Sequence, residues 1–297
     1  MSDELKSKLC RQTLIIPGMS HPTVAILGAG SMGEILAEGL LRAGWETENL
    51  TLVARREERA REAERRTAIA TLLDPAAACE GRDVVVIAVK PKDVDYLLEQ
   101  IGETVQADQV VVSLAAGVPI EVYERVLQDI AVVRAMPNTP AAVDEGMTAY
   151  CGGRHADSDA LALADMVLSA VGETIELSED LLDAVTAVSG TGPAYVFLLA
   201  EALTEAAIRE GLPHHAAEKL VIQTLRGAGA LLSVSDKSAF RLRAEVTSPG
   251  GTTAAALHML EDGGFRALME RAVQSAAQRS RELGESAIAN ADKAKDA

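Results

Sequence analysis

The stretch Val24-Ala25-Ile26-Leu27-Gly28-Ala29-Gly30-Ser31-Met32-Gly33 decides the fold of this 297-residue chain. Its first four residues are apolar and predict a buried strand, and three glycines in the spacing GxGxxG follow at once. Apolar residues then recur at helical spacing as far as Ala43, and Gly44 stands where a helix C-cap belongs. GxGxxG alone is a weak signal, but a strand before it and a helix after it are the setting in which it binds a dinucleotide.

Each glycine of this loop has its own physical purpose. Gly28 permits the tight turn, Gly30 lets the backbone approach a pyrophosphate without a Cβ in the way, and Gly33 lets the helix pack close to the sheet. The start of the helix adds N–H groups and a partial positive charge, both of which attract phosphate. The alternative is an ordinary turn between a strand and a helix that happens to contain glycines.

The end of the second expected strand distinguishes NADP from NAD. An NAD site usually places a carboxylate there to bind the ribose 2′-hydroxyl, but this chain has Ala54-Arg55-Arg56. Guanidinium groups pair with a 2′-phosphate that a carboxylate would repel. Arg55 and Arg56 therefore favour NADPH, with NADH as the alternative cofactor. The competing interpretation is that both arginines are solvated charges at the start of a charged helix.

Short apolar runs alternate with helical stretches across the N-terminal half of the chain. The run at 84–89 is apolar throughout, as in a strand buried on both faces of a parallel sheet. Lys90 follows at the carboxyl end, where doubly wound sheets bind ligands, so it is either a phosphate or ribose ligand or an ordinary surface lysine. The order of elements predicts a Rossmann-like, doubly wound α/β domain at 22–178. Strands are expected at 24–27, 50–54, 83–89, 110–115, 132–136, 148–150 and 174–177.

The chain changes character after residue 178, where β-branched runs stop and helical patterns continue. The helix at 194–208 is apolar around most of its surface, which predicts burial in a core or between subunits. We therefore expect an all-α C-terminal domain at 179–287 that forms a homodimer. Residues 1–21 and 288–297 are expected to be an extension and a fraying tail. Helices are expected at 179–188, 194–210, 215–232, 252–260 and 265–283.

Composition and residue spacing indicate which binding partners and which cellular compartment to expect. The formal net charge of −16 should repel nucleic acid and anionic membrane surfaces. The apolar stretch at 14–16 is too short for a signal peptide or a membrane span. Cys10, Cys79 and Cys151 form no disulfide or zinc pattern, which indicates a reducing cytoplasm. No metal site is expected, since the adjacent pair His214-His215 does not share a helix face.

A second glycine-rich loop, Ser248-Pro249-Gly250-Gly251-Thr252-Thr253, precedes a helical stretch in the C-terminal domain. Pro249 stiffens the loop, the two glycines bare their N–H groups, and the helix start adds further donors. Such a concavity suits a carboxylate, with Ser248 and Thr252 as hydroxyl donors. On spacing alone, a capped loop without any ligand fits equally well.

From about residue 23 to about residue 285 the sequence resembles the pyrroline-5-carboxylate reductases, which make proline. The loop at 28–33, Ala88-Val89-Lys90-Pro91 and Met136-Pro137-Asn138-Thr139-Pro140 are shared with other NADP dehydrogenases. Two C-terminal motifs are more specific. Ser189-Gly190-Thr191-Gly192-Pro193-Ala194-Tyr195 resembles the family's SGSGPAY element, and residues 246–253 resemble its signature VTSPGGTT.

The resemblance implies an NADPH-dependent oxidoreductase that reduces L-1-pyrroline-5-carboxylate to L-proline, the last step of proline biosynthesis. It also implies a dimer through interlocked C-terminal helices, and a catalytic role for Thr253, whose hydroxyl hydrogen-bonds to the ring nitrogen, orients it and helps to deliver the proton. Ala115-Ala116-Gly117 are expected beside Asn138, near the nicotinamide. The implied substrate contacts, at the interface with the cofactor domain, are Ser248, Gly250, Gly251, Thr252 and Thr253. The implied cofactor contacts are Leu27, Gly28, Ala29, Gly30, Ser31, Met32, Ala88, Val89, Lys90, Pro91 and Asn138.

One position departs from the family pattern, and two alternative functions stay open. Many relatives have an asparagine that helps to hold the cofactor ribose where this chain has Pro75, and Asp74 is the candidate replacement. A related imine or 3-hydroxy-acid dehydrogenase would use a lysine of the helical domain, for which Lys219 and Lys237 are candidates outside any matching motif. A redox regulator that binds NADP without turnover is the other alternative, against which an intact carboxylate loop argues.

Overall fold

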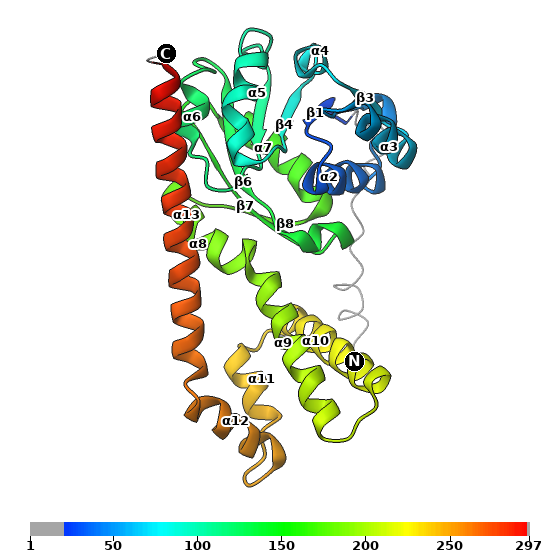
Figure 1. Cartoon of the computed structure of the whole chain (residues 1–297), viewed down its shortest axis with the longest axis vertical. Coiled ribbons are helices and arrows are strands. Elements are labelled where there is room, and N and C mark those ends of the chain that lie inside the picture. The colour runs from blue at the N-terminus through cyan, green and yellow to red at the C-terminus, as the bar shows by residue number, and fades with distance from the viewer. Residues whose placement is uncertain (1–20, 296–297) are drawn as a thin grey trace. The chain divides into compact units, whose positions relative to one another are not determined.

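The computed structural model describes residues 21–295, and the chain divides into two compact units. The sheet unit contains residues 21–193 and 273–295, and the helical unit contains residues 194–272 (Figure 1). This division falls inside the expected C-terminal domain at 179–287 rather than at its ends. Most of the expected N-terminal extension, with Cys10, lies outside the described residues, as do residues 296–297 of the expected tail.

The sheet unit contains a single mixed sheet of eight strands. They are β1 Val24–Leu27, β2 Leu50–Val53, β3 Ala70–Leu72, β4 Val84–Ile87, β5 Val110–Ser113, β6 Ala131–Met136, β7 Gly146–Gly152 and β8 Gly172–Glu176. Their order is β3-β2-β1-β4-β5-β6-β7-β8, and all pairs from β3 to β6 are parallel. The order reverses beside β1, which confirms the expected doubly wound, Rossmann-like fold. Leu27 pairs with both Val53 and Ile87, so β1, β2 and β4 end at one edge of the sheet.

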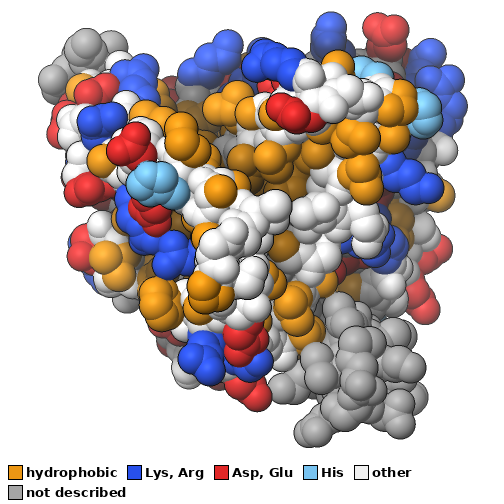
Figure 2. Space-filling view, turned by 90° about the horizontal axis from the view of Figure 1, so that it is seen from below, with side chains coloured by type: hydrophobic (Ala, Val, Ile, Leu, Met, Phe, Trp, Pro, Cys, Tyr) orange, Lys and Arg blue, Asp and Glu red, His pale blue; other side chains and the backbone are white. Residues whose placement is uncertain are grey.

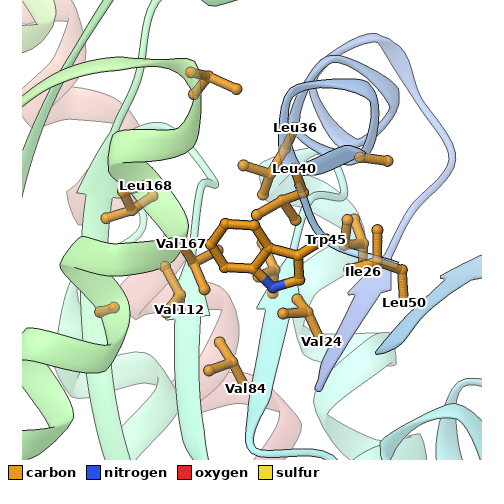
Figure 3. Packing of buried hydrophobic residues seen from close by; sticks show 14 of the residues in the cluster. Val24, Ile26, Leu36, Leu40, Trp45, Leu50, Val84, Val112, Val167 and Leu168 are labelled. Carbon is orange, nitrogen blue, oxygen red and sulfur yellow. The ribbon is translucent and has the colours of Figure 1, made fainter. Parts of the chain in front are cut away.

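Helices cover both faces of this sheet. They are α2 Ser31–Arg42, α3 Glu57–Thr67, α4 Pro75–Cys79, α5 Val94–Ile101, α6 Ile120–Glu124, α7 Ser158–Leu168 and α8 Leu182–Val185. Successive strand residues point to opposite faces, so in β1 Val24 and Ile26 join one hydrophobic cluster while Ala25 and Leu27 join a second. The first cluster includes Trp45 and side chains of α2 and α7, which Figure 3 labels, together with side chains of α3. The second cluster includes side chains of α4, α5, α6 and α8.

Two strands differ from the expectation. β3 is absent from the expected set, and it is an edge strand of only three residues, none of them buried. β7 runs antiparallel to β6, so this pair is not one of the strand–helix–strand units on which the doubly wound prediction rests. The segment at 137–145 that joins them is shorter than the crossover of about a dozen residues that a parallel pair needs.

The last helix, α13 (Phe265–Lys295), contributes its residues 273–295 to the sheet unit. There Ala287, Ile288 and Ala291 pack against the second cluster. Together with Gly284 they follow the spacing i, i+3, i+4, i+7, which places them on one helix face. The segment at 288–297, expected to fray, is therefore helical through Lys295, because part of its surface packs on the sheet unit.

The helical unit has almost no core of its own. It contains α9 (Gly192–Arg209) from residue 194, α10 His214–Val234, α11 Ala239–Glu245, α12 Thr252–Asp262 and the start of α13. Of its described residues only Ala217 and Val221 are buried, whereas Phe197 is 60% and Leu198 is 65% exposed. Figure 2 shows many hydrophobic side chains on the face that it views. The sequence pattern missed α11, although its N-cap Ser238 is a readable signal.

Among the described residues, one helical stretch, Glu179–Arg209, is long and apolar enough to cross a membrane, with a mean hydropathy of 1.3. Only 11% of its most apolar window is buried within the chain. A membrane or a second protein surface would each cover such a helix.

Candidate functional site

The glycine-rich loop between β1 and α2 has the geometry that a dinucleotide site requires. A Cβ on Gly33 would lie 2.0 Å from the Gly28 carbonyl oxygen. Gly28 has a φ of +125°, and a Cβ there would lie 2.8 Å from the Ala88 oxygen. Neither position accepts a side chain. A Cβ on Gly30 would meet nothing within 4 Å, so the loop is tightly packed at Gly28 and Gly33 and open at Gly30.

Backbone donors at this loop divide into two groups. The N–H groups of Gly28 and Ala29 both donate to the Val53 carbonyl, at 3.1 and 2.7 Å. Gly30 is the N-cap residue of α2, and no side chain caps this end of the helix. Ser31 and Met32 therefore contribute first-turn N–H groups which, with the helix dipole, can bind a phosphate.

The end of β4 brings further predicted ligands to the same edge of the sheet. Leu27 is fully buried, and its carbonyl accepts the Ala88 N–H at 3.0 Å, which holds the end of β4 beside the loop. Val89 is half-buried, while Lys90 and Pro91 are exposed at the start of a short 3₁₀ helix, Pro91–Asp93. The fold thus places the predicted cofactor residues of β1 and β4 next to one another.

Arg55 and Arg56 lie at this edge too, directly after β2, and both are exposed. Arg55 Nη1 lies 3.0 Å from Asp93 Oδ1, and the arginine side chain is 74% exposed. An exposed ion pair of this kind contributes little to stability, so the Arg55 guanidinium can exchange Asp93 for a phosphate at small cost. Arg56 is the N-cap residue of α3, a second helix start at which an anion is favoured.

Asn138 connects two motifs that are far apart in the sequence. Its Nδ2 donates to both the carbonyl and the hydroxyl oxygen of Ser189 at 3.2 Å, and its Oδ1 accepts the Met147 N–H at 2.9 Å. Ser189 lies in a π-helical turn, Thr186–Gly190, and such turns are frequent at functional sites. The Asn138 side chain therefore organises the chain here, and its contact with a cofactor stays a prediction.

Sequence reasoning missed the residues that support the loop Ala115-Ala116-Gly117. Ser113 Oγ lies 2.5 Å from Tyr123 OH and also accepts the Ala115 N–H at 3.2 Å. Burial raises the pKa of Tyr123 above its ordinary value, so the phenol stays protonated. Gly117 has a φ of +75°, and a Cβ there would lie 3.1 Å from Leu283 Cβ of α13. The one available signal was a serine at the end of an otherwise apolar strand.

Asp74 is engaged within its own helix. Its carboxylate accepts the N–H groups of Ala76 and Ala77, at 3.0 and 3.5 Å, as the N-cap of α4. Pro75 is the first residue of that helix, a position that proline favours. The pair at 74–75 thus forms a helix start, which accounts for both residues without a cofactor contact.

The second predicted site lies in the helical unit, in the loop before α12. Gly250 has a φ of +70°, and the Gly251 N–H donates to the Ser248 carbonyl at 3.1 Å. Gly251 is the N-cap residue of α12, and no side chain caps this end of the helix. Ser248 and Thr252 are exposed, and Thr253 is half-buried. The loop therefore offers hydroxyl groups and uncapped helix donors to an anion.

Other candidate chemical groups are buried, paired or solvated. The residues from 21 to 295 include no group of three or more His, Cys, Asp or Glu side chains that could hold a metal ion. Burial raises the pKa of the Cys79 and Cys151 thiols to about 12, which makes both poor nucleophiles. Lys237 Nζ pairs with Glu245 at 2.8 Å, and Lys219 is exposed on α10.

Comparisons with known proteins match both units. The family model "Pyrroline-5-carboxylate reductase dimerisation" matches residues 179–283, and the model "NADP oxidoreductase coenzyme F420-dependent" matches residues 23–117. The pyrroline-5-carboxylate reductase of Corynebacterium melassecola is 42% identical over 266 residues, which cover 88% of this chain and 98% of that protein. The reductase of the same name from Mycobacterium tuberculosis is 42% identical over 284 residues, with coverage of 88% and 96%.

Two solved structures are similar over nearly the same length. A pyrroline-5-carboxylate reductase from Coxiella burnetii has a TM-score of 0.83 and 35% sequence identity, and the match covers 88% of this chain and 98% of that chain. Pyrroline carboxylate reductase from Plasmodium falciparum, solved with NADP bound, has a TM-score of 0.81 and 30% identity, with coverage of 90% and 100%. Coverage of this extent includes residues of the sheet unit and of the helical unit.

Proposed function

The chain belongs to the pyrroline-5-carboxylate reductase family, and from this premise we propose that it reduces L-1-pyrroline-5-carboxylate to L-proline with NADPH, the last step of proline biosynthesis. One observation carries the proposal: two uncapped helix starts on one chain, at α2 beside the open Gly30 and at α12 beside the loop at 248–253. The first suits a dinucleotide and the second suits a small carboxylate.

The main task of the protein in this reaction is to position the substrate against the cofactor. When bound, NADPH supplies the hydride that reduces the imine carbon of the ring. The chain has to hold that carbon in a near-attack geometry. The ring nitrogen gains a proton, so we assign to Thr253 a hydrogen bond that orients the nitrogen and assists proton delivery. The substrate carboxylate is assigned to the hydroxyl and N–H donors of Ser248, Gly250, Gly251 and Thr252.

We assign the cofactor to the open side of the loop at 28–33. Its pyrophosphate would bind the N–H groups of Ser31 and Met32, and its 2′-phosphate would bind Arg55 and Arg56. The bound NADP of the P. falciparum relative supports this type of cofactor. NADH has no 2′-phosphate, so it would bind the same loop without the two arginines.

We propose further that two copies of the chain form a dimer through their helical units. The family model for dimerisation covers 179–283, and the unit buries only Ala217 and Val221 among its described residues. A second copy would also cover the apolar stretch Glu179–Arg209, so we assign that stretch to a subunit interface and not to a membrane. Free cysteines at 79 and 151 fit a reducing cytoplasm, and the net charge of −16 disfavours nucleic acid as a partner.

The test is an assay of the purified full chain with NADPH and pyrroline-5-carboxylate. We expect loss of NADPH absorbance with one proline formed for each NADPH consumed. No proline with either NADPH or NADH would contradict the proposal. A second assay, which follows the reduction of NADP with a 3-hydroxy acid as substrate, tests the alternative dehydrogenase. Turnover in this second assay alone would favour the alternative.

A further inference from the structure

A buried carboxylate lies directly behind the glycine-rich loop. Glu34 is the fourth residue of α2 and is only 3% exposed. A negative charge in the first turn stabilises the helix through its dipole. The same charge opposes the binding of a pyrophosphate to that helix start, because like charges repel and a buried charge is poorly screened. The loop therefore needs a cation on Glu34 before it suits a dinucleotide.

Two arginines of α3 provide this compensation. Arg59 Nη2 lies 2.6 Å from Glu34 Oε1, and Arg66 Nη1 lies 2.8 Å from Glu34 Oε2. Arg66 is shared with Glu38, at 2.7 Å, and its side chain is 49% exposed. The Arg59 side chain is 29% exposed, so its interaction with Glu34 is less screened by solvent.

Arg59 also holds the backbone of the loop. Its Nε donates to the Ala29 carbonyl oxygen at 3.0 Å, while the Ala29 N–H donates to Val53 at 2.7 Å. Within a trans peptide, the C=O of one residue and the N–H of the next point in opposite directions. An Ala29 carbonyl that points toward Arg59 therefore directs the Gly30 N–H in the opposite direction, away from Arg59. Gly30 is the exposed N-cap position at which the loop is open.

We propose that Arg59 is a positioning residue of the cofactor site, acting on the pyrophosphate half of the cofactor through the Ala29 peptide and through Glu34. The inference rests on the proposed role of the loop at 28–33. Arg59 donates to or pairs with three acceptors, on Ala29, Glu34 and Glu62. It differs in this from the exposed arginines after β2 that we assign to the 2′-phosphate. NADPH and NADH share the pyrophosphate, so Arg59 supports the binding of both equally.

The test measures cofactor binding by isothermal titration calorimetry on the purified full chain. Arg59→Met should raise the Kd of NADPH and of NADH alike by about tenfold, because Glu34 loses its closer cation, which is the larger effect, and the Ala29 carbonyl loses its donor, which is the smaller one. Turnover at saturating NADPH should stay near the wild-type value. A loss confined to NADPH would make Arg59 a 2′-phosphate ligand and overturn the proposal, and so would an unchanged Kd. The matched control is Arg61→Met on the same helix, because Arg61 forms an exposed pair with Glu57.

Two further variants separate positioning from a purely structural role. In the Arg59→Met variant, the Glu34 carboxylate has lost its closer cation. Adding Glu34→Gln to this variant removes the uncompensated charge, so the Kd of NADPH and of NADH should recover to within about threefold of wild type. No recovery would overturn the neutralising role of Arg59. Arg59→Lys keeps the charge with fewer donors, should bind both cofactors with intermediate affinity, and replaces the methionine variant if that one fails to fold. Binding is measured without pyrroline-5-carboxylate, so failure of the proposed reaction would not be mistaken for failure of this inference.

Discussion

At the scale of single residues, the glycines of the loop at 28–33 are restricted for different reasons, and this separates folding from cofactor binding. A Cβ added to Gly33 would lie 2.0 Å from the Gly28 carbonyl oxygen, so the fold itself requires a glycine at this position. Gly30 faces open space, and its φ of −92° suits any residue, so the fold does not require a glycine there. A glycine at position 30 is explained by a ligand that comes close to the backbone.

We therefore expect two alanine substitutions in one loop to behave differently. Gly33→Ala should lower the free energy of unfolding by about 2 kcal/mol, because the new methyl group overlaps a backbone oxygen. Gly30→Ala should change it by less than about 0.5 kcal/mol but raise the Kd of NADPH by about tenfold, because the methyl group occupies the pyrophosphate space. Chemical denaturation and calorimetry measure the two effects. Equal affinity of Gly30→Ala and wild type for NADPH would contradict the assignment of the loop.

The arginines after β2 lead to a prediction about cofactor choice. Replacing both Arg55 and Arg56 by Ala should raise the KM for NADPH by about tenfold or more while leaving the KM for NADH nearly unchanged, because only NADPH has the 2′-phosphate. Steady-state kinetics with each cofactor measure the two values. Asp93→Ala is the control, since it removes the partner of Arg55 and leaves both guanidinium groups in place. Similar changes for both cofactors would show that the arginines do not bind the 2′-phosphate.

The two adjacent threonines at the start of α12 should separate catalysis from substrate binding. Thr253→Val removes the hydroxyl assigned to the ring nitrogen at nearly constant volume, and kcat should fall about 100-fold while the Kd of NADPH stays unchanged. Thr252→Val is the matched variant and should mainly raise the KM for pyrroline-5-carboxylate, because Thr252 is assigned to the carboxylate. Equal losses of turnover and of NADPH binding in Thr253→Val would refute its catalytic role.

At the scale of elements, the sequence predicted the strands and helices that have a clear hydrophobic pattern of their own. β1 and β4 are strongly apolar and were correctly expected, whereas β3 is short and unburied and was missed. The direction of β7 depends on the length of its connection to β6 and not on its own residues. The end of α13 has an apolar spacing that was readable, but its alanine- and lysine-rich composition suggested a tail.

The candidate sites were predictable to a similar extent. The glycine-rich loops at 28–33 and 248–253 are contiguous, so their spacing alone identified them. The supporting contacts of Arg59 with Ala29 and of Asn138 with Ser189 join segments that are distant in the sequence. Each partner is ordinary in its local context, so no pattern within one segment could reveal these pairs.

The packing of α13 on the sheet unit can be tested with two neighbouring positions. Ile288 packs against the second hydrophobic cluster, and Ala289 beside it is exposed. Ile288→Asp should lower the free energy of unfolding by about 2 kcal/mol, because it places a charge against apolar side chains. Ala289→Asp introduces the same charge on the solvent side and should change stability by less than about 0.5 kcal/mol. Denaturation curves of the two variants measure the difference, and equal stability would show that this end of α13 does not contribute to the core.

At the scale of the whole molecule, the two units differ in how much apolar surface each buries within itself. The sheet unit contains two extensive buried clusters, one on each face of the sheet. The helical unit buries only Ala217 and Val221 among its described residues, which is too little apolar burial to offset the entropy of ordering its helices. Its large apolar side chains are mostly exposed on a single chain. The missing burial must come from another surface, and a second copy of the same helices supplies one with matching apolar content.

This reasoning predicts that dimerisation and folding of the helical unit are coupled. Leu198 on α9 is 65% exposed, and Leu198→Glu should shift the protein from dimer toward monomer at micromolar concentration, because it places a charge in an apolar interface. Helical content should fall with dissociation, since the monomer lacks a core at 194–272. Sedimentation equilibrium and circular dichroism measure both. Gln100→Glu introduces the same carboxylate on an exposed position of α5 and should leave the dimer intact. A monomeric wild type with full helical content would contradict the interface, and a wild type that inserts into lipid vesicles would instead assign Glu179–Arg209 to a membrane.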